Sequence, residues 1–146
     1  MKKIMCSVLF AVLVMAVSPV WSQAPNDEIL LFVGLKLDDL MMRFGIPQSV
    51  HAVRGGEIWQ DDVVFVYNEG DFYIFRDRVW QIGLRTALGM RIGDAMAVAQ
   101  LTLGESAQDR GDYFLYRIPG STWPVSLRVN ISAGRISGIF VFREDF

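Results

Sequence analysis

Apolar residues recur at helical spacing in two short segments of this chain. In residues 34–47, Leu40 and Phe44 lie one helical turn apart and two acidic residues precede them, which predicts a helix of two turns. We expect Asp38 to cap this helix by accepting a backbone N–H, and the glycine and proline after Phe44 to end it. A second helix, again closed by a glycine, is predicted at residues 95–103.

The other apolar segments have the composition and alternation of β-strands. Residues 63–67 are β-branched or aromatic throughout, which is the strongest strand signal in the chain. In residues 125–132 the apolar set beginning at Val125 faces one way and the polar set beginning at Ser126 faces the other. Turn residues separate most of these segments, which predicts antiparallel meanders. Further strands are expected at 49–53, 72–75, 78–84, 113–118 and 135–142, with a short arm at 57–60, and residues 29–33 are either a helical turn or an edge strand.

The order of a helix followed by a meander occurs twice along the chain. Gly34 aligns with Gly89, and Arg78 aligns with Arg135 once a small difference in loop length is allowed for. One unit alone would expose an apolar sheet face, whereas two units can share one sheet. We therefore predict an α+β fold in which two tandem helix-plus-antiparallel-meander repeats, about 31–86 and about 87–146, form one sheet with the helices packed on one face.

Residues 1–24 have the pattern of a cleaved secretory signal peptide. Two lysines precede an apolar run of about a dozen residues, and Ser22 and Ala24 supply the small residues of a signal peptidase site. An uncleaved anchor is the alternative, but the run is shorter than the roughly 20 residues that a spanning helix needs. We expect a single mature domain at 25–146, periplasmic or secreted, with no stable membrane insertion after cleavage.

Charge and cysteine content narrow the partners and the chemistry of the mature chain. The full chain has a net charge of −2, and removing the two lysines of the leader leaves 12 basic against 16 acidic residues, a net charge of −4. An acidic protein is poorly suited to nucleic acid or to an anionic membrane, so neither is expected as a partner. The single cysteine, Cys6, lies in the leader, so the mature domain is expected to be stabilised by packing without disulfides.

The glycine, proline and aromatic positions of the first unit resemble a known module. The pattern begins with Gly-x-x-x-Asp-Asp-Leu and Phe-Gly-x-Pro in residues 34–47, and continues with Tyr-x-x-Gly-x-Phe-x-x-Phe-x-x-Arg-Val-x-x-Ile in residues 67–82. Over about 34–142 the chain is similar to the β-lactamase-inhibitor-protein-like fold and to the small SmpA/OmlA-type envelope proteins that accompany outer-membrane β-barrel assembly. The resemblance implies two tandem copies of this module and a protein-binding role. The chain departs from both groups, because it has no lipobox cysteine and its mature part has no disulfide.

No combination of residues indicates a catalytic or metal centre. His51 is the only histidine, and with Ser49 beside it there is no identifiable third member of a nucleophilic triad. With one histidine and no mature cysteine, a transition-metal site of ordinary ligand number is not expected. Calcium binding by oxygen ligands at 61–62 or 68–71, and glycoside cleavage by paired acids, are the alternatives. We predict no catalytic residue, no metal ligand and no cofactor.

Aromatic side chains are more numerous on the predicted strands and loops than core packing requires. In a two-layer domain only one face of the sheet packs on helices, so aromatic residues on the other face can form a contact surface. The alternative is that twisted strands and loops cover that face, and alternation leaves open which register points outward. We predict partner binding through Trp59, Tyr67, Tyr73, Tyr113, Tyr116, Trp123 and Arg128.

These observations together predict an exported, non-enzymatic binding protein of the bacterial envelope. Its partner is expected to be another envelope or extracellular protein, recognised through the open sheet face and the adjoining loops. One alternative is a small-ligand or cell-wall-glycan binding module, in which the aromatic residues line a groove. Another is a hydrolase that uses Asp61 or Asp62, which would require acids that converge in a cleft and have displaced pKa values.

Overall fold

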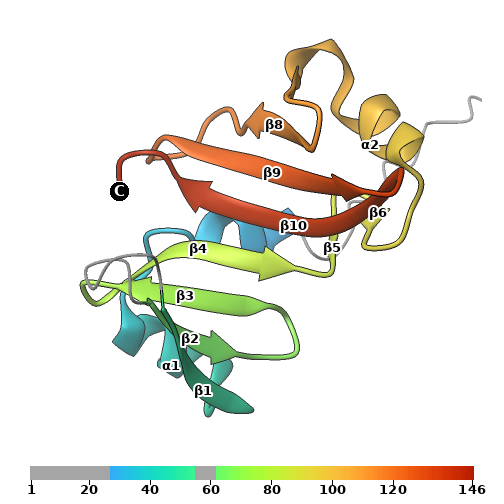
Figure 1. The fold of residues 1–146 in the computed structure, drawn as a ribbon. Coiled ribbons are helices and arrows are strands. Elements are labelled where there is room, and N and C mark those ends of the chain that lie inside the picture. The colour runs from blue at the N-terminus through green and yellow to red at the C-terminus, as the bar shows by residue number, and fades with distance from the viewer. Residues whose placement is uncertain (1–26, 55–61) are drawn as a thin grey trace, which may run out of the picture.

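A single large antiparallel sheet dominates the fold. The computed structural model describes residues 27–54 and 62–146, which form an α+β arrangement around this sheet (Figure 1). The predicted signal peptide at 1–24 and the predicted arm at 57–60 lie outside the described residues. Within the described residues, no helix has the length and apolar character needed to span a membrane.

Eight strands form the sheet in the order β1-β2-β3-β4-β10-β9-β8-β7, and every neighbouring pair is antiparallel. The central pair is β4 and β10, in which Leu84 lies opposite Ile139 and Ile82 opposite Val141. This pair is the seam that joins the first half of the chain to the second. The strands of the sheet are β1 (Ser49–Val53), β2 (Asp62–Val66), β3 (Asp71–Phe75), β4 (Arg78–Leu84), β7 (Gln108–Asp109), β8 (Tyr113–Arg117), β9 (Val125–Ser132) and β10 (Arg135–Arg143).

Three short strands lie outside what alternation predicts. β5 (Thr86–Ala87) and β6 (Met90–Arg91) pair with each other in a separate two-stranded sheet. β7 lies in a segment whose polar composition predicts a loop. Each of these strands has two residues, which is too short for a period of two to be recognised.

The helices begin and end close to their predicted positions, but the predicted cap is wrong. Helix α1 (Leu37–Phe44) has Lys36 at its N-cap position, and no side chain caps it there. The Asp38 carboxylate instead accepts the N–H of Asp39 (2.9 Å), because Asp38 already lies in the first turn, where its charge still favours the helix dipole. Gly45 ends the helix with a φ of 77°. The other helices are η1 (Asp27–Phe32), which is a 3-10 helix, α2 (Met96–Leu103) and the single turn η3 (Gly104–Ser106).

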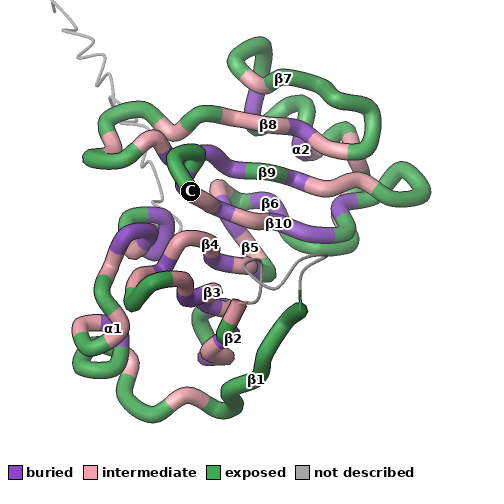
Figure 2. Tube along the Cα trace, turned by 60° about the vertical axis from the view of Figure 1, so that its left-hand side comes forward, coloured by how far each residue is buried: buried purple, intermediate pink, exposed green. Residues whose placement is uncertain are grey.

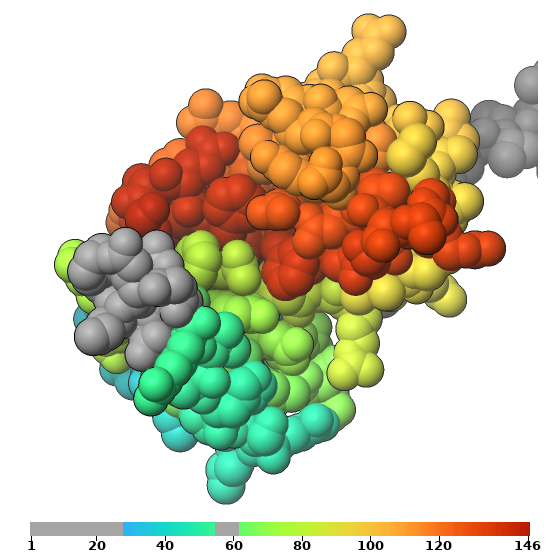
Figure 3. Space-filling model, viewed as in Figure 1, coloured from blue at the N-terminus to red at the C-terminus, as the bar shows by residue number. Residues whose placement is uncertain are grey.

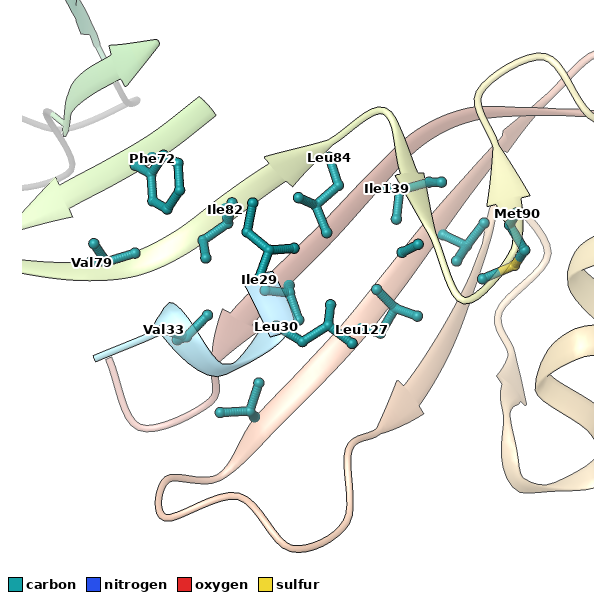
Figure 4. Close-up of a cluster of buried hydrophobic side chains, with 14 of the residues drawn as sticks. Ile29, Leu30, Val33, Phe72, Val79, Ile82, Leu84, Met90, Leu127 and Ile139 are labelled. Carbon is teal, nitrogen blue, oxygen red and sulfur yellow. The ribbon is translucent and has the colours of Figure 1, made fainter. Parts of the chain in front are cut away.

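One hydrophobic core connects the helices with the sheet. Leu40 of α1 and Ala99 of α2 are fully buried in it, together with the inward-facing residues of the central strands. The 3-10 helix η1 adds Ile29 and Leu30 to the same cluster, and Figure 4 shows them among the buried side chains of the sheet. Of the two alternatives expected for residues 29–33, a helical turn and an edge strand, the structure has the helical turn.

Strand pairing fixes which residues share a face of the sheet, because directly opposite side chains in antiparallel strands point to the same side. Val129 of β9 is buried in the core and lies opposite the equally buried Ile139 of β10. The next pair along these strands, Arg128 and Phe140, therefore points away from the helices. We call this side of the sheet the open face, and Figures 1 and 3 view the molecule from it.

The alternation predicted for β9 is confirmed. Val125, Leu127 and Val129 are at most 3% exposed, whereas Arg128 between them is exposed. Ser126 is the exception within β9, since it points to the open face but is fully buried, and its hydroxyl donates to a carboxylate oxygen of Glu144.

The hairpins β3–β4 and β9–β10 have matching local geometry. Both turn through two residues of positive φ, which are 47° and 64° at residues 76–77 and 49° and 72° at residues 133–134. Each hairpin also carries a one-residue bulge at the same distance from the turn, at Trp80 in β4 and at Ser137 in β10. A bulge locally bends and twists its strand, so the two hairpins are reshaped in the same way.

Matching hydrogen bonds tie each hairpin to the chain that enters a helix. The Arg78 Nη1 donates to the carbonyl of Gly34 (3.0 Å), and the Arg135 Nη1 donates to the carbonyl of Gly93 (2.8 Å). Each glycine also donates its backbone N–H to a carbonyl of the neighbouring strand. Gly34 donates to Val79 (2.7 Å) and Gly93 to Ile136 (2.8 Å). These bonds align Gly34 with Gly93 rather than with Gly89, which was the position predicted from the sequence.

Candidate binding surfaces

The open face carries an aromatic pair held in place on β3 and β4. Tyr73 lies in the middle of β3, and the bulge in β4 turns Trp80 to the same side, so that the two ring centroids are 6.4 Å apart in an edge-to-face arrangement. The Trp80 Nε1–H donates to Asp62 Oδ1 (2.9 Å). Burial, followed by the nearby carboxylates of Asp71 and Asp62, raises the pKa of the Tyr73 phenol.

Two phenylalanines of β10 extend this aromatic surface across the seam. Phe140 lies opposite Gly83 and Phe142 opposite Gln81. A Cβ at Gly138 would come within 2.8 Å of the Phe140 ring, and a Cβ at Gly83 within 3.5 Å. The Phe140 ring thus occupies space that Gly138 leaves free on the open face, whereas a Cβ at Gly83 would meet the ring in ordinary van der Waals contact.

Strands β8 and β9 add an aromatic residue and a positive charge. The Arg128 guanidinium lies over the Tyr113 ring, 4.3 Å from its centroid, and its Nε donates to Asn130 Oδ1 (2.7 Å). A cation over an aromatic ring contributes about 0.5–1 kcal/mol at an exposed site, so the arginine is ordered while it stays accessible. We define the open-face cluster as Tyr73, Trp80, Tyr113, Arg128, Phe140 and Phe142.

The predicted contact residues that the structure describes lie in three places: on the open face, in the β8–β9 loop and on the core side of the sheet. Tyr73, Tyr113 and Arg128 lie together on the open face. Trp123 lies in the loop between β8 and β9 and is 38% exposed. Trp59 lies outside the described residues.

The other two predicted contact residues, Tyr67 and Tyr116, do not lie on the open face. Tyr67 is 4% exposed, packs edge to face on Phe72 at 5.6 Å, and donates its hydroxyl to the Gly45 carbonyl (3.1 Å). Burial raises the pKa of this phenol. Tyr116 lies opposite the fully buried Leu127 and packs against the core. Both tyrosines therefore stabilise the fold from the core side of the sheet.

Sequence reasoning missed half of the open-face cluster, namely Trp80, Phe140 and Phe142. The signal for the two phenylalanines is present, because they alternate with Ile139 and Val141 in a strand that is apolar on both faces. Alternation alone could not identify which of the two apolar sets faces out. Trp80 could not be assigned to a face at all, because a bulge interrupts the period at that residue.

A second site, which we call the Arg143 pocket, lies at one end of the sheet. It has a volume of about 520 Å³ and opens between the β3–β4 turn, the β8–β9 loop and the residues after β10. Its lining residues are Phe75, Arg76, Arg78, Trp123, Arg143, Asp145 and Phe146.

Arg143 is the fixed element of this pocket. Its side chain is only 7% exposed and lies between two rings, 3.8 Å from the Trp123 centroid and 4.4 Å from the Phe146 centroid. Its Nε and Nη2 both donate to the Asp145 carboxylate, at 2.9 and 2.7 Å. These hydrogen bonds hold the pKa of Asp145 below its ordinary value. The pair is a bidentate charge-assisted contact, which fixes the orientation of the guanidinium plane.

Several acidic residues of the described segments accept hydrogen bonds within turns. The side chains of Asp94 and Asp109 each accept a backbone N–H at 2.8 Å within their own turns. In the part of the chain that the structure describes, no three histidine, cysteine or acidic residues are grouped as a metal site would require. Ser49 and His51 lie on β1, the edge strand, which is exposed along its whole length (Figure 2).

Comparison with solved structures finds two proteins whose folds are similar to this one. No protein-family model and no curated protein matches the chain. The fold is similar to that of an extracellular protein containing a SCP domain from Bacillus anthracis str. Ames, with a TM-score of 0.58 and 12% sequence identity, over 91% of this chain and 51% of that chain. A cysteine-rich secretory protein from Staphylococcus aureus subsp. aureus Mu50 is similar with a TM-score of 0.48 and 12% identity, over 78% of this chain and 45% of that chain. The chain thus spans about half the length of either protein.

This comparison corrects the family resemblance drawn from the sequence. The structural neighbour is an extracellular protein with a SCP domain, and not a β-lactamase-inhibitor-protein-like or SmpA/OmlA-type module, so that resemblance is wrong. The motif that suggested it consists of glycine, proline and core positions. Such residues specify turns and packing, and they recur wherever a short helix leads into antiparallel strands.

Proposed function

We propose that this chain is an exported, non-enzymatic binding protein that recognises another envelope or extracellular protein through the open-face cluster. The observation that carries the proposal is the gathering of five aromatic side chains and one exposed arginine on the side of the sheet opposite the core. Aromatic residues and arginine dominate the energetics of protein interfaces. The extracellular location of the similar Bacillus anthracis protein supports export.

The open-face cluster is ordered before any partner arrives. Trp80 is fixed by its bond to Asp62, Arg128 by Tyr113 and Asn130, and Phe140 by the glycines beneath it. Association normally costs about 0.5–1.5 kcal/mol for each side chain that must be immobilised. A surface whose anchors are already held loses less of this free energy, which favours recognition of a complementary protein surface.

A small-ligand or cell-wall-glycan binding module is the alternative interpretation of the same aromatic residues. Such a module would need these residues to line a concave groove. The Arg143 pocket is lined by other residues at the end of the sheet. The open-face cluster is therefore better suited to a broad protein contact than to a single sugar or cofactor.

The proposal includes a duplication of one helix-plus-meander unit. The matching turns, bulges and arginine–glycine hydrogen bonds of the two hairpins support it. The first unit would supply Tyr73 and Trp80, and the second Tyr113, Arg128 and Phe140. A continuous aromatic surface would then exist only where the two units meet at the seam.

Site-specific cross-linking tests the proposed surface. A photo-activated residue at Gln81, which is half-buried in the middle of the open face, should capture one protein in the native envelope. The same residue at Leu101, which is 85% exposed on α2, is the matched control and should not capture that protein. Equal capture from both positions would contradict the assignment of the surface.

Binding measurements with the purified captured protein complete the test. Tyr73→Ala and Arg128→Glu should each weaken its binding by about tenfold or more, since each removes an interface anchor. Met42→Ala, at a residue that is 77% exposed on α1, should leave the affinity unchanged. The proposal is wrong if the open-face variants keep their thermal stability and bind as tightly as the unmodified protein.

A further inference from the structure

We propose that the Arg143 pocket binds the carboxylate of an aromatic acid. The source of this group is either a free small acid or the terminal carboxylate of a peptide that ends in an aromatic residue. The pocket shares no residue with the open-face cluster, so the inference stands independently of the proposed function. The argument rests on the charge, the rings and the backbone of the pocket.

The side chains that line the pocket carry more positive than negative charge. Three arginines line it, and Asp145 has the single acidic side chain among its lining residues. That acid already accepts two hydrogen bonds from Arg143. Within residues 27–54 and 62–146, no ion pair joins Arg76 or Arg78 to a carboxylate. Two cationic side chains are therefore left to attract an anion on a protein whose net charge is −2.

The aromatic rings of the pocket contact the arginines and one another in a continuous series. They give a bound anion an apolar surface beside the guanidinium groups. Arg143 lies between Trp123 and Phe146, and Phe146 meets Phe75 edge to face at 6.0 Å. Arg76 continues the series, 5.1 Å from the Phe75 centroid. An inorganic anion would use only the arginines, whereas an aromatic acid would contact both the guanidinium groups and the rings.

The backbone holds Arg76 in an unfavourable conformation. Its φ of 47° lies in the left-handed region, and the following Asp77 has a φ of 64°. Two-residue turns of this kind strongly prefer Asn-Gly, Asp-Gly or Gly-Gly. The corresponding turn of the other hairpin, at 133–134, does use a glycine second. Backbone strain of this kind is found at functional sites, so the left-handed Arg76 at the pocket supports a role in binding.

The size of the pocket and the geometry of arginine define the ligand class. A volume of about 520 Å³ is in the range of small-molecule sites. Guanidinium groups match carboxylates in a planar, two-bond geometry. Arg78 is already positioned, because its Nη1 donates to the Gly34 carbonyl and leaves its other nitrogens for a ligand. A single aromatic ring with one carboxylate fits this combination.

Calorimetric titration of the full-length protein with phenylacetate tests the pocket. Phenylacetate should bind saturably, while phenylacetamide, which has the same shape without the charge, should bind at least about tenfold more weakly. Acetate, which has the charge without the ring, should also bind at least about tenfold more weakly. Equal affinities for phenylacetate and phenylacetamide would overturn the role of the arginines.

Because the β9–β10 hairpin has the same local geometry as the β3–β4 hairpin, it supplies matched control variants. Arg76→Asn should weaken phenylacetate binding by about tenfold or more and should not destabilise the fold, because asparagine tolerates the left-handed conformation. Ala133→Asn places an asparagine at the corresponding position of the other turn and should leave binding unchanged. Arg78→Gln and Arg135→Gln form a second pair with the same expectation. Equal binding by Arg76→Asn, Arg78→Gln and their controls would refute the site.

A peptide arm distinguishes the two sources of the carboxylate. The tripeptide Gly-Gly-Phe with a free C-terminus is compared with its C-terminal amide. Tighter binding of the free tripeptide than of phenylacetate indicates a peptide terminus, and the reverse order indicates a small acid. Absence of saturable binding by both probes up to about 10 mM would contradict the proposal, since this limit corresponds to a very weak interaction.

Discussion

At the scale of single residues, Gly34 is constrained both by its own backbone and by Trp123. Its φ is 96°, and a Cβ at this position would come within 2.5 Å of Trp123 Nε1. The indole that helps to form the Arg143 pocket thus rests directly on the turn that begins α1. The absence of a side chain at Gly34 is required for the pocket wall as well as for the turn.

Gly34→Ala is therefore expected to destabilise the protein by about 2–4 kcal/mol, since it combines backbone strain with an overpacked contact. Denaturant unfolding measures the loss. Gly89→Ala is the matched control, because Gly89 has a φ of 79° but no atom within 4 Å of the added Cβ. It should show the backbone cost alone, about 1 kcal/mol. Equal losses for the two variants would show that the Trp123 contact is unimportant.

At the scale of elements, the two helices have the same length but bury different side chains. Each has eight residues and ends at a glycine of positive φ. The residue in the fourth position is fully buried in both, and it is Leu40 in α1 but Ala99 in α2. Leu40 is the one buried residue of α1, so the attachment of this helix to the sheet depends on that side chain, whereas α2 buries both Ala99 and Leu103.

Leu40→Ala should destabilise the protein by about 2–5 kcal/mol, because it removes a fully buried side chain and leaves a cavity. Leu101→Ala, at an 85% exposed position of α2, makes the same chemical change on the surface and should alter the free energy of unfolding by less than about 0.5 kcal/mol. Chemical denaturation of both variants gives the comparison. A small loss for Leu40→Ala would mean that α1 is not anchored through this residue.

Most of the helices and longer strands could be predicted from the sequence, because their apolar periods are long enough to recognise. The helix start was misplaced by two residues, since an aspartate such as Asp38 is favoured both at the cap and in the first turn. The contact surface was harder to predict. Tyr67 follows β2 directly and Tyr73 lies in the neighbouring strand β3, yet one is buried in the core and the other lies on the open face.

The Arg143 pocket could not be predicted from the sequence. Arg76, Trp123 and Arg143 lie in three separate segments, and only the pairing of β4 with β10 and of β9 with β10 brings these segments together. No local pattern marks any of the three as a lining residue. Long-range register is the missing information, and a single sequence gives no direct measure of it.

At the scale of the whole molecule, one core cluster spans both halves of the chain. It includes Leu40 and Ile82 from the first half and Leu127 and Ile139 from the second. We therefore expect a single cooperative unfolding transition of the full-length protein, in which the calorimetric and van't Hoff enthalpies agree. Two transitions, or a calorimetric enthalpy well above the van't Hoff value, would show that the halves are independently stable.

The pairing of β4 with β10 also sets the order of events while the chain is being synthesised. β4 is complete at Leu84, but its partner strand begins only at Arg135. Until the ribosome has added residue 143, the nascent first half presents two unpaired strand edges, one on β4 and the other on β1. Unpaired edges are templates for incorrect association, so the half-synthesised chain is the form most in need of protection by chaperones.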